Sequence, residues 1–273
     1  IRETDAIIHV LRCFDNDNIV HVDTTVDPVR DKETIDIELQ LKDLESLEKR
    51  LERVKKTART GNKEAQKELE VLERVLKGLE ASISVRAIEF TEKEREEYIR
   101  PIQFITDKPV LYVCNVDEEG AVSGNAYVDA VKEAVKDEEA EVIVLAVGVE
   151  ADITELETFE EREMFLDDLG LTEPGSSVLI RSAYKLLNLQ TYFTAGVKEV
   201  RAWTINIGDT GPQAAGVIHT DFEKGFIRAE VIAYDDYVEY GSEAKVKEAG
   251  KMRVEGKEYI VKDGDVMHFR FNV

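Results

Sequence analysis

Several features that mark other classes of protein are scarce or missing in this sequence of 273 residues. No apolar run approaches the roughly 18 residues that span a bilayer, which argues against a membrane partner. The only two cysteines, Cys13 and Cys114, lie far apart in apolar segments. We therefore expect buried thiols in the reducing cytoplasm, not a disulfide or metal framework. The net charge of −22 argues against a chain that coats nucleic acid or reads a DNA sequence.

The residues that are present predict a parallel α/β sheet. Hydrophobic residues make up 43% of the chain, which is enough for well-packed cores, and the length suits two domains. Apolar segments at 5–14, 109–115 and 141–147 predict buried strands. Residues 125–140 have helical spacing. Strand, helix and strand in this order, with continuous apolar strands, predict a sheet covered by helices on both faces.

Two heptad-like helices are predicted between the first two strands. Apolar positions recur every three or four residues from Leu44 to Ala58 and again from Ala65 to Leu79. The turn-forming residues 60–62 lie between the two runs. Helices joined by so short a turn must run antiparallel, so we expect a coiled-coil hairpin at residues 43–97.

The predicted hairpin contains a basic segment, although the chain as a whole is acidic. Residues 49–67 hold eight Lys or Arg against two Glu. Lys55, Lys56, Arg59 and Lys63 lie around the turn. A solvated helical face is the plain alternative. A basic tip on an arm favours contact with an RNA-rich partner.

The last part of the chain predicts a mixed α+β module without a cofactor motif. Strands at 200–207 and 226–233 flank a Gly/Pro turn and a short helix. Asp263-Gly264 predicts a β-hairpin that closes the chain.

The stretch VLYVCNVDEEG, residues 110–120, is similar to the purine-reading loop of GTP-binding domains, Asn-Lys-x-Asp, but departs from it at two positions. Val116 stands where the lysine stem covers the sugar and ring, and Glu118 stands where an aspartate accepts two guanine N–H bonds. Glutamate is one methylene longer, and a fork of hydrogen bonds does not tolerate that shift. Adenine offers an acceptor and a donor that backbone groups near Val116 could meet. The pattern therefore favours ATP over GTP.

On these residues the chain resembles the YchF or Obg-like ATPases, a branch of the translation-factor class of P-loop NTPases. The resemblance covers essentially the whole sequence and is most specific at 1–22, 186–205, 214–232 and 250–269. It implies a mostly parallel sheet of the P-loop NTPase type at 1–42 and 98–187. It also implies the helical insertion at 43–97 and a C-terminal TGS domain, a β-grasp module, at 188–273.

The resemblance further implies an ATP-hydrolysing switch that engages ribosomes or ribosomal RNA. Proteins of this family begin with a Walker A loop, and no G-x-x-x-x-G-K-[ST] occurs in these 273 residues. We expect that loop, the switch segments and the Mg²⁺ ligands to precede Ile1. The chain alone is then expected not to hydrolyse ATP, whereas the intact protein should.

The resemblance and the loop chemistry together predict the base site. Asn115 would support the first loop, Val116 would pack on or hydrogen-bond the base, and Glu118 would fail to select guanine. The second loop follows the next strand, where Ala146, Val147 and Gly148 allow close approach of the backbone. An acidic surface turn and a plain strand-to-helix turn are the alternatives.

Catalysis has one candidate in this sequence. His21 lies in the DNDNIVHVD segment beyond the first strand, where it could reach the γ-phosphate and position water; the alternative is a surface histidine. For the whole protein two other functions remain open, a non-catalytic RNA-, ribosome- or protein-binding module and a GTPase with relaxed base choice.

Overall fold

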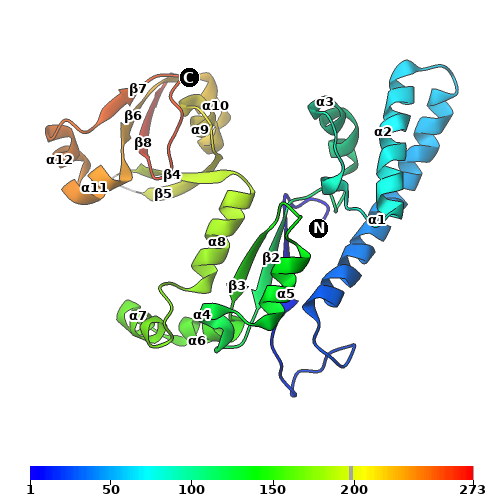
Figure 1. Cartoon of the computed structure of the whole chain (residues 1–273). Helices are drawn as coiled ribbons and strands as arrows, with labels where there is room; N and C mark the ends of the chain where they lie inside the picture. Colours follow the sequence, from blue (N-terminus) through cyan, green and yellow to red (C-terminus); the bar gives the residue numbers. More distant parts are fainter. Residues whose placement is uncertain (197–198, 273) are drawn as a thin grey trace. The chain divides into compact units, whose positions relative to one another are not determined.

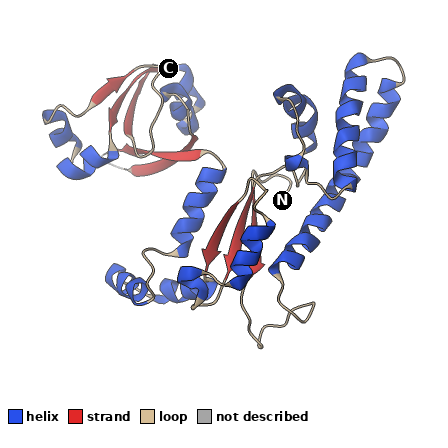
Figure 2. Ribbon diagram, in the orientation of Figure 1, coloured by secondary structure: helices blue, strands red, loops and turns tan. Residues whose placement is uncertain are grey.

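The computed structural model describes residues 1–196 and 199–272, and its contacts divide the chain into two units, Ile1–Leu186 and Leu187–Val273. Each unit has its own sheet (Figures 1 and 2). No helix in the described ranges has the length and apolar character needed to cross a bilayer.

The first unit is built on a parallel sheet of three strands, in the order β1-β2-β3. Its strands are β1 (Ile7–Arg12), β2 (Val110–Asn115) and β3 (Glu141–Leu145). The predicted strands and their parallel arrangement are thus confirmed. The helices of this unit are α1 (Pro28–Ala58), α2 (Lys63–Glu80), α3 (Glu92–Glu94), α4 (Gly120–Ser123), α5 (Ala126–Ala134), α6 (Val147–Glu155), α7 (Phe159–Asp168) and α8 (Gly175–Leu186).

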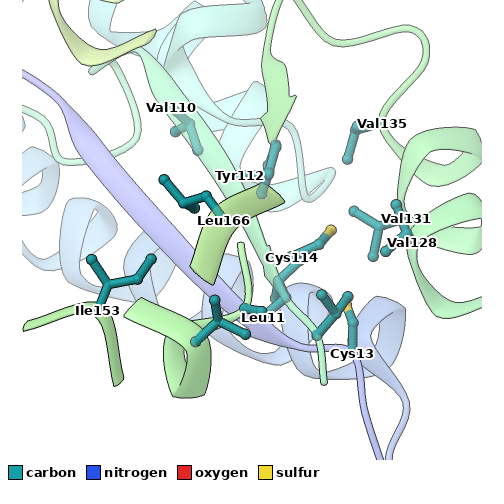
Figure 3. Close-up of a cluster of buried hydrophobic side chains, with 13 residues drawn as sticks. Leu11, Cys13, Val110, Tyr112, Cys114, Val128, Val131, Val135, Ile153 and Leu166 are labelled. Atoms are coloured by element: carbon teal, nitrogen blue, oxygen red, sulfur yellow. The ribbon is translucent and has the colours of Figure 1, made fainter. Parts of the chain in front are cut away.

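Alternating side chains of the strands build two separate cores. Tyr112 and Cys114 of β2 point to one face, where they meet Val128 and Val131 of α5 (Figure 3). Cys13 lies in the same cluster, and both cysteines are free and buried, as the sequence predicted. On the other face, Leu111, Val113, Ile143 and Leu145 pack against α8.

Helices cover both faces of the sheet at β2 and β3, whereas the α8-side face of β1 is exposed in this chain. Ile8 pairs with Leu111 and Val10 pairs with Val113 in the register, so all four point to the α8 face. Ile8 is nevertheless 47% exposed and Val10 57% exposed. Among the residues described, α8 packs through Val178, Leu179 and Leu186 on residues of β2 and β3.

Helices α1 and α2 lie side by side and are joined by residues 59–62 (Figure 1). The first helix begins where the Asp27 carboxylate accepts the Val29 and Arg30 N–H groups and Pro28 fits the first turn. Gly61, with φ of +84°, turns the chain, and Asn62 caps α2. The apolar stripes of the two helices form one core around Leu47, Leu72 and Val75.

The buried Asp43 carboxylate fixes the base of this helical pair. It accepts hydrogen bonds from the Ile105 N–H at 2.8 Å, the Thr106 N–H at 2.7 Å and the Thr106 hydroxyl at 2.8 Å. Arg2 lies 3.3 Å from it. A carboxylate with no exposed surface is tolerated because these donors replace water.

A second buried polar cluster ties α1 to the sheet. Lys32 Nζ lies 2.8 Å from carboxylate oxygens of both Asp36 and Glu138, and the Tyr112 hydroxyl donates to Glu138 at 2.8 Å. Burial lowers the pKa of Lys32, but the two hydrogen bonds outweigh it and the net shift is upward. The pKa of Glu138 falls because the hydrogen bonds from Lys32 and Tyr112 outweigh the opposing effect of burial. The lysine is therefore charged when α1 is docked.

The second unit has a mixed sheet of five strands in the order β5-β4-β8-β6-β7. Its strands are β4 (Leu189–Ala195), β5 (Val200–Asn206), β6 (Phe226–Ile232), β7 (Arg253–Glu255) and β8 (Val266–Phe271). Its helices are α9 (Gly211–Ile218), α10 (Thr220–Lys224), α11 (Tyr234–Tyr240) and α12 (Glu243–Glu248). Helix α9 packs on β5 and β6 over a core that includes Tyr192, Ala215 and Met267.

The predicted β-hairpin around Asp263-Gly264 is wrong. Gly264 turns the chain with φ of +81°, but the turn docks on β4: Asp263 accepts the Thr191 N–H, and the Gly264 N–H donates to the Thr191 carbonyl. The strand that follows, β8, pairs with β4 and β6, which are distant in the sequence.

Candidate functional site

Three loops meet at one edge of the parallel sheet. The carboxyl ends of β1, β2 and β3 lead into residues 13–27, the loop after Asn115 and the loop after Leu145 (Figure 1). Parallel strands place their carboxyl ends at the same edge, and α/β proteins bind ligands there. The sequence-predicted residues of the two purine-side loops and His21 are thereby brought to one edge.

Asn115 connects the first purine-side loop to the second. Its side-chain oxygen accepts a hydrogen bond from the Val147 N–H at 3.1 Å. The Val116 N–H donates to the Leu145 carbonyl at 3.0 Å, which extends the β2–β3 pairing by one residue. The two loops are therefore joined by two hydrogen bonds.

Val116 is held within the chain by its side chain and its backbone. Its side chain is only 3% exposed and belongs to the core beneath the loop, and its N–H is bound to Leu145. A Cβ atom on Gly120 would lie 2.9 Å from Val116 Cβ, so glycine is required above it. In this conformation the Val116 side chain is buried and its N–H is bound within the chain, and its expected contact with a base stays a prediction.

Glu118 lies in the exposed turn that follows. The Asp117 carboxylate accepts the Gly120 N–H at 3.0 Å and shapes this turn, while the Glu118 carbonyl accepts the Ala121 N–H. Within residues 1–196 and 199–272, the Glu118 carboxylate has no hydrogen bond or ion pair. It is available to a ligand but is not held in place for one.

The second loop divides into a buried and an exposed part. Ala146 is 7% exposed and packs in the core, whereas Val147 is 44% exposed. A Cβ atom added at Gly148 would meet nothing within 4 Å, so packing inside the chain does not require glycine there. The Val147 side chain and the Gly148 backbone are the accessible parts of this loop.

His21 is oriented by two partners in the 13–27 loop and the first turn of α1. Its Nδ1 accepts the Asp23 N–H at 3.2 Å, which leaves the proton on Nε2, 2.9 Å from an Asp31 carboxylate oxygen. Its side chain is 17% exposed. The Asp31 carboxylate and the Asp23 N–H fix the tautomer and the ring plane, and they engage both ring nitrogens, so His21 can orient water only when one of these bonds opens.

His21, Asp23 and Asp31 bring donor atoms within 4.8 Å of one another, a spacing that could hold a cation. The Arg30 guanidinium already fills that electrostatic role, 3.1 Å from Asp31 and 3.7 Å from Asp23. Magnesium prefers octahedral oxygen ligands, and this cluster offers a nitrogen beside a cation. The cluster does not fit Mg²⁺.

Arg12 organises the loop that holds His21, and sequence reasoning missed it. Its guanidinium donates to the carbonyls of Phe14, Asn16 and Ile19 at 2.9–3.2 Å and lies over the Phe14 ring. The same loop is tied to the start of α5, where the Asn125 amide donates to the Cys13 carbonyl at 2.7 Å. The sequence around Arg12 contains no motif from which its contacts with this loop could have been predicted.

The four basic residues predicted at the turn of the helical pair are where the sequence placed them. Lys55 and Lys56 end α1, Arg59 follows it and Lys63 begins α2. All four are exposed, and in the described part of the chain none forms an ion pair. The nearest paired cations, Arg50 and Lys67, are bound to Glu68 and Glu64.

These features define an α/β unit with a candidate site at its strand ends, followed by a second unit of mixed sheet. The C-terminal residues 189–272 match the family model YchF-GTPase_C, described as a protein of unknown function (DUF933). Over its full length the chain is 55% identical to the Ribosome-binding ATPase YchF of Pasteurella multocida and 50% identical to that of Bacillus subtilis. It covers 74% of the first of these proteins and 75% of the second.

A solved structure agrees with these relatives. The Schizosaccharomyces pombe YchF GTPase matches 98% of this chain and 73% of its own, with a TM-score of 0.84 and 37% identity. The chain therefore belongs to the YchF family.

Proposed function

We propose that the intact protein binds and hydrolyses ATP in the cytoplasm and contacts the ribosome through its helical arm. The relatives in Pasteurella multocida and Bacillus subtilis are named as ribosome-binding ATPases, whereas the S. pombe structure is titled a GTPase. Family membership alone thus leaves the base open, and the choice rests on the loop after β2.

The observation that carries the choice of ATP is the state of Glu118. Guanine selection requires a carboxylate held at one distance from two adjacent N–H groups, with a lysine stem over the ring. Here the Glu118 side chain is longer than aspartate, and its carboxylate is exposed and has no partner among the residues described. The position of the lysine is occupied by the buried Val116. The exposed Val147 side chain and the open Gly148 backbone give the base an apolar contact that selects no guanine edge.

Phosphate chemistry is supplied outside these loops. The sequence contains no Walker A pattern, and the cluster around His21 does not suit magnesium, so we assign no Mg²⁺ ligand to this chain. When bound, magnesium neutralises charge on the transferred phosphoryl group. The role that we assign to this chain is to hold the purine and to supply His21, which would orient water once its bond to Asp31 or to the Asp23 N–H opens. We further propose that residues 188–273 form a TGS domain of the β-grasp type.

Titration of the intact protein with fluorescent ATP and GTP tests the base assignment. We expect ATP to bind more tightly, and a preference for GTP of even a few-fold contradicts the proposal. The substitution Glu118→Asp restores the shorter acidic side chain that guanine-binding loops have at this position. Because hydrogen bonds to a charged group each contribute on the order of tenfold in binding, we expect the GTP to ATP affinity ratio to rise by about that factor. Glu119→Asp, the neighbouring exposed acid, is the matched control.

A GTPase with relaxed base choice is the second candidate, favoured by the name of the S. pombe relative. Phosphate release measured with each nucleotide separates the candidates. Equal release from ATP and GTP supports relaxed choice. Release from neither supports a non-catalytic module that acts through its arm.

A further inference from the structure

The Glu150 side chain is placed where the second purine-side loop meets helix α8. Glu150 lies in the first turn of α6, and its backbone N–H donates to the Ala146 carbonyl at 3.1 Å. Its carboxylate accepts the Gly175 N–H at 2.6 Å through one oxygen and the Ser176 N–H at 3.0 Å through the other. One residue thus holds the loop with its backbone and α8 with its side chain.

The contact with α8 is strong for a physical reason. Gly175 and Ser176 are the first residues of a 12-residue helix, whose N-terminal N–H groups have no partner within the helix. A carboxylate bound to two of them satisfies both donors and complements the positive end of the helix dipole. The α8 terminus is held by a charge that belongs to α6.

Packing makes the contact close. A Cβ atom on Gly175 would lie 2.2 Å from Leu145 Cδ1, so any larger residue there would have to displace the Leu145 side chain at the end of β3. A cavity of about 150 Å³ lies beside the contact and is lined by Ala146, Glu150 and Gly175, among others. The second loop is therefore supported on one side by Asn115, through Val147, and on the other by Glu150, through α8.

We propose that Glu150 is a positioning residue for nucleotide binding: its carboxylate, bound to the start of α8, holds the Ala146–Gly148 loop in the conformation that receives the purine. This inference rests on the proposed function, because it takes that loop to contact the base. Ligand and anchor must then stabilise each other, since any effect of the anchor on nucleotide affinity is matched by an equal effect of nucleotide on the anchor.

The effect of ATP on the bond between Glu150 and the start of α8 can be tested without a variant. In the intact wild-type protein, ATP should slow hydrogen exchange at the Gly175 and Ser176 amides. The same amides should show no slowing in Glu150→Ala. Unchanged exchange in the wild-type protein at saturating ATP overturns the inference, even where Glu150→Ala fails to fold.

Affinity gives the second test. Each hydrogen bond to a charged group contributes on the order of tenfold in an equilibrium constant, and because the anchor acts on the base only through the loop, we expect Glu150→Ala to weaken ATP binding by about the factor of one such bond. Turnover at saturating ATP should change little, and Glu150→Gln, which keeps an acceptor without the charge, should recover part of the loss. Glu155→Gln is the matched control, an exposed acid in the last turn of the same helix.

The outcomes separate this inference from the proposed function. A wild-type protein that binds ATP, together with a folded Glu150→Ala variant of equal affinity, overturns the role of Glu150 and leaves the ATPase proposal standing. A wild-type protein that does not bind ATP overturns both. A loss of turnover without a loss of affinity contradicts positioning of the base loop.

Discussion

His9 is a partly buried histidine whose protonated form is disfavoured in the folded chain. It lies in β1 against the Tyr112 ring, with Asp36, Lys32, Arg86 and Glu138 around it. Burial is the main cause that lowers its pKa, and the two carboxylates oppose that shift only in part. A lowered pKa in the folded state means that the unfolded chain takes up the proton first as the pH falls.

The consequence is a loss of stability on mild acidification. The contribution of neutral His9 is fully present above the ordinary histidine pKa of about 6.5 and is lost as the pH falls below it. We expect His9→Leu to flatten the free energy of unfolding between pH 7 and pH 5, measured by urea denaturation. The pKa of Glu138 is also lowered, so the stability that its ionised form contributes is lost only at a pH below this range. His268→Asn, at an exposed position on β8, is the control; an equal pH slope in His9→Leu and wild type contradicts this account.

His21 is the residue through which this chain could affect hydrolysis itself. Positioned groups that assist proton transfer contribute roughly 100-fold or more, so we expect His21→Ala in the intact protein to lower turnover by about that factor with ATP affinity retained. Asp31→Asn keeps the shape of the partner but removes its charge and should lower turnover less. His219→Ala, in the second unit, is the control. Unchanged turnover with unchanged affinity in His21→Ala eliminates the assignment.

Local patterns predicted the elements better than their partners. The three parallel strands and the helical pair follow from apolar periodicity, which is a property of neighbouring residues. The partners of β8 depend on contacts between distant segments, and the Asp263-Gly264 signal was indistinguishable from a true hairpin turn. The same limit hid Asp43, whose partners lie 62 and 63 residues away.

The site shows the same division at the level of single residues. Asn115 and the loop that holds His21 follow the ends of parallel strands, which share one edge of a sheet, but their roles in a site stay predictions. The burial of Val116 was missed, since an apolar residue after a strand is equally able to pack inward or to cover a ligand. Glu150 and Arg12 gave no motif, and only the packed structure brings their partners within reach.

The tip of the helical pair is the element whose role can be tested by charge alone. Neutralising Lys55, Lys56, Arg59 and Lys63 to Gln removes four exposed and unpaired cations of the described chain. If they bind ribosomal RNA, the slope of log affinity against log salt should fall by about three, because each phosphate contact releases most of one counterion. Ribosome pelleting over a salt series measures this slope.

The matched control changes the same number of charges elsewhere in the first unit. Lys42, Lys132, Lys136 and Arg100 are exposed and lie away from the tip, so their replacement by Gln should leave the slope near the wild-type value. Undiminished pelleting of the tip variant at low and at high salt removes the arm from the proposed function.

At the scale of the whole molecule, the two units should unfold separately. The core of the second unit, around Tyr192, Phe226 and Met267, is drawn entirely from residues after the boundary at Leu187, and its strands pair among themselves. A unit with its own core and complete sheet pairing meets the physical definition of a domain. We therefore expect residues 187–273, produced alone, to melt in one cooperative transition.

A pair of methionine variants tests this independence within the longer chain. Met267 is 2% exposed, so Met267→Ala should destabilise its unit by about 2–5 kcal/mol through a lost side chain and a cavity. The calorimetric transition of the second unit should shift by the same amount in the isolated segment and in the whole chain, while that of the first unit stays in place. Met164→Ala, at a position 69% exposed on α7, should shift neither. A single transition that moves as a whole with Met267→Ala would show that the two units fold as one.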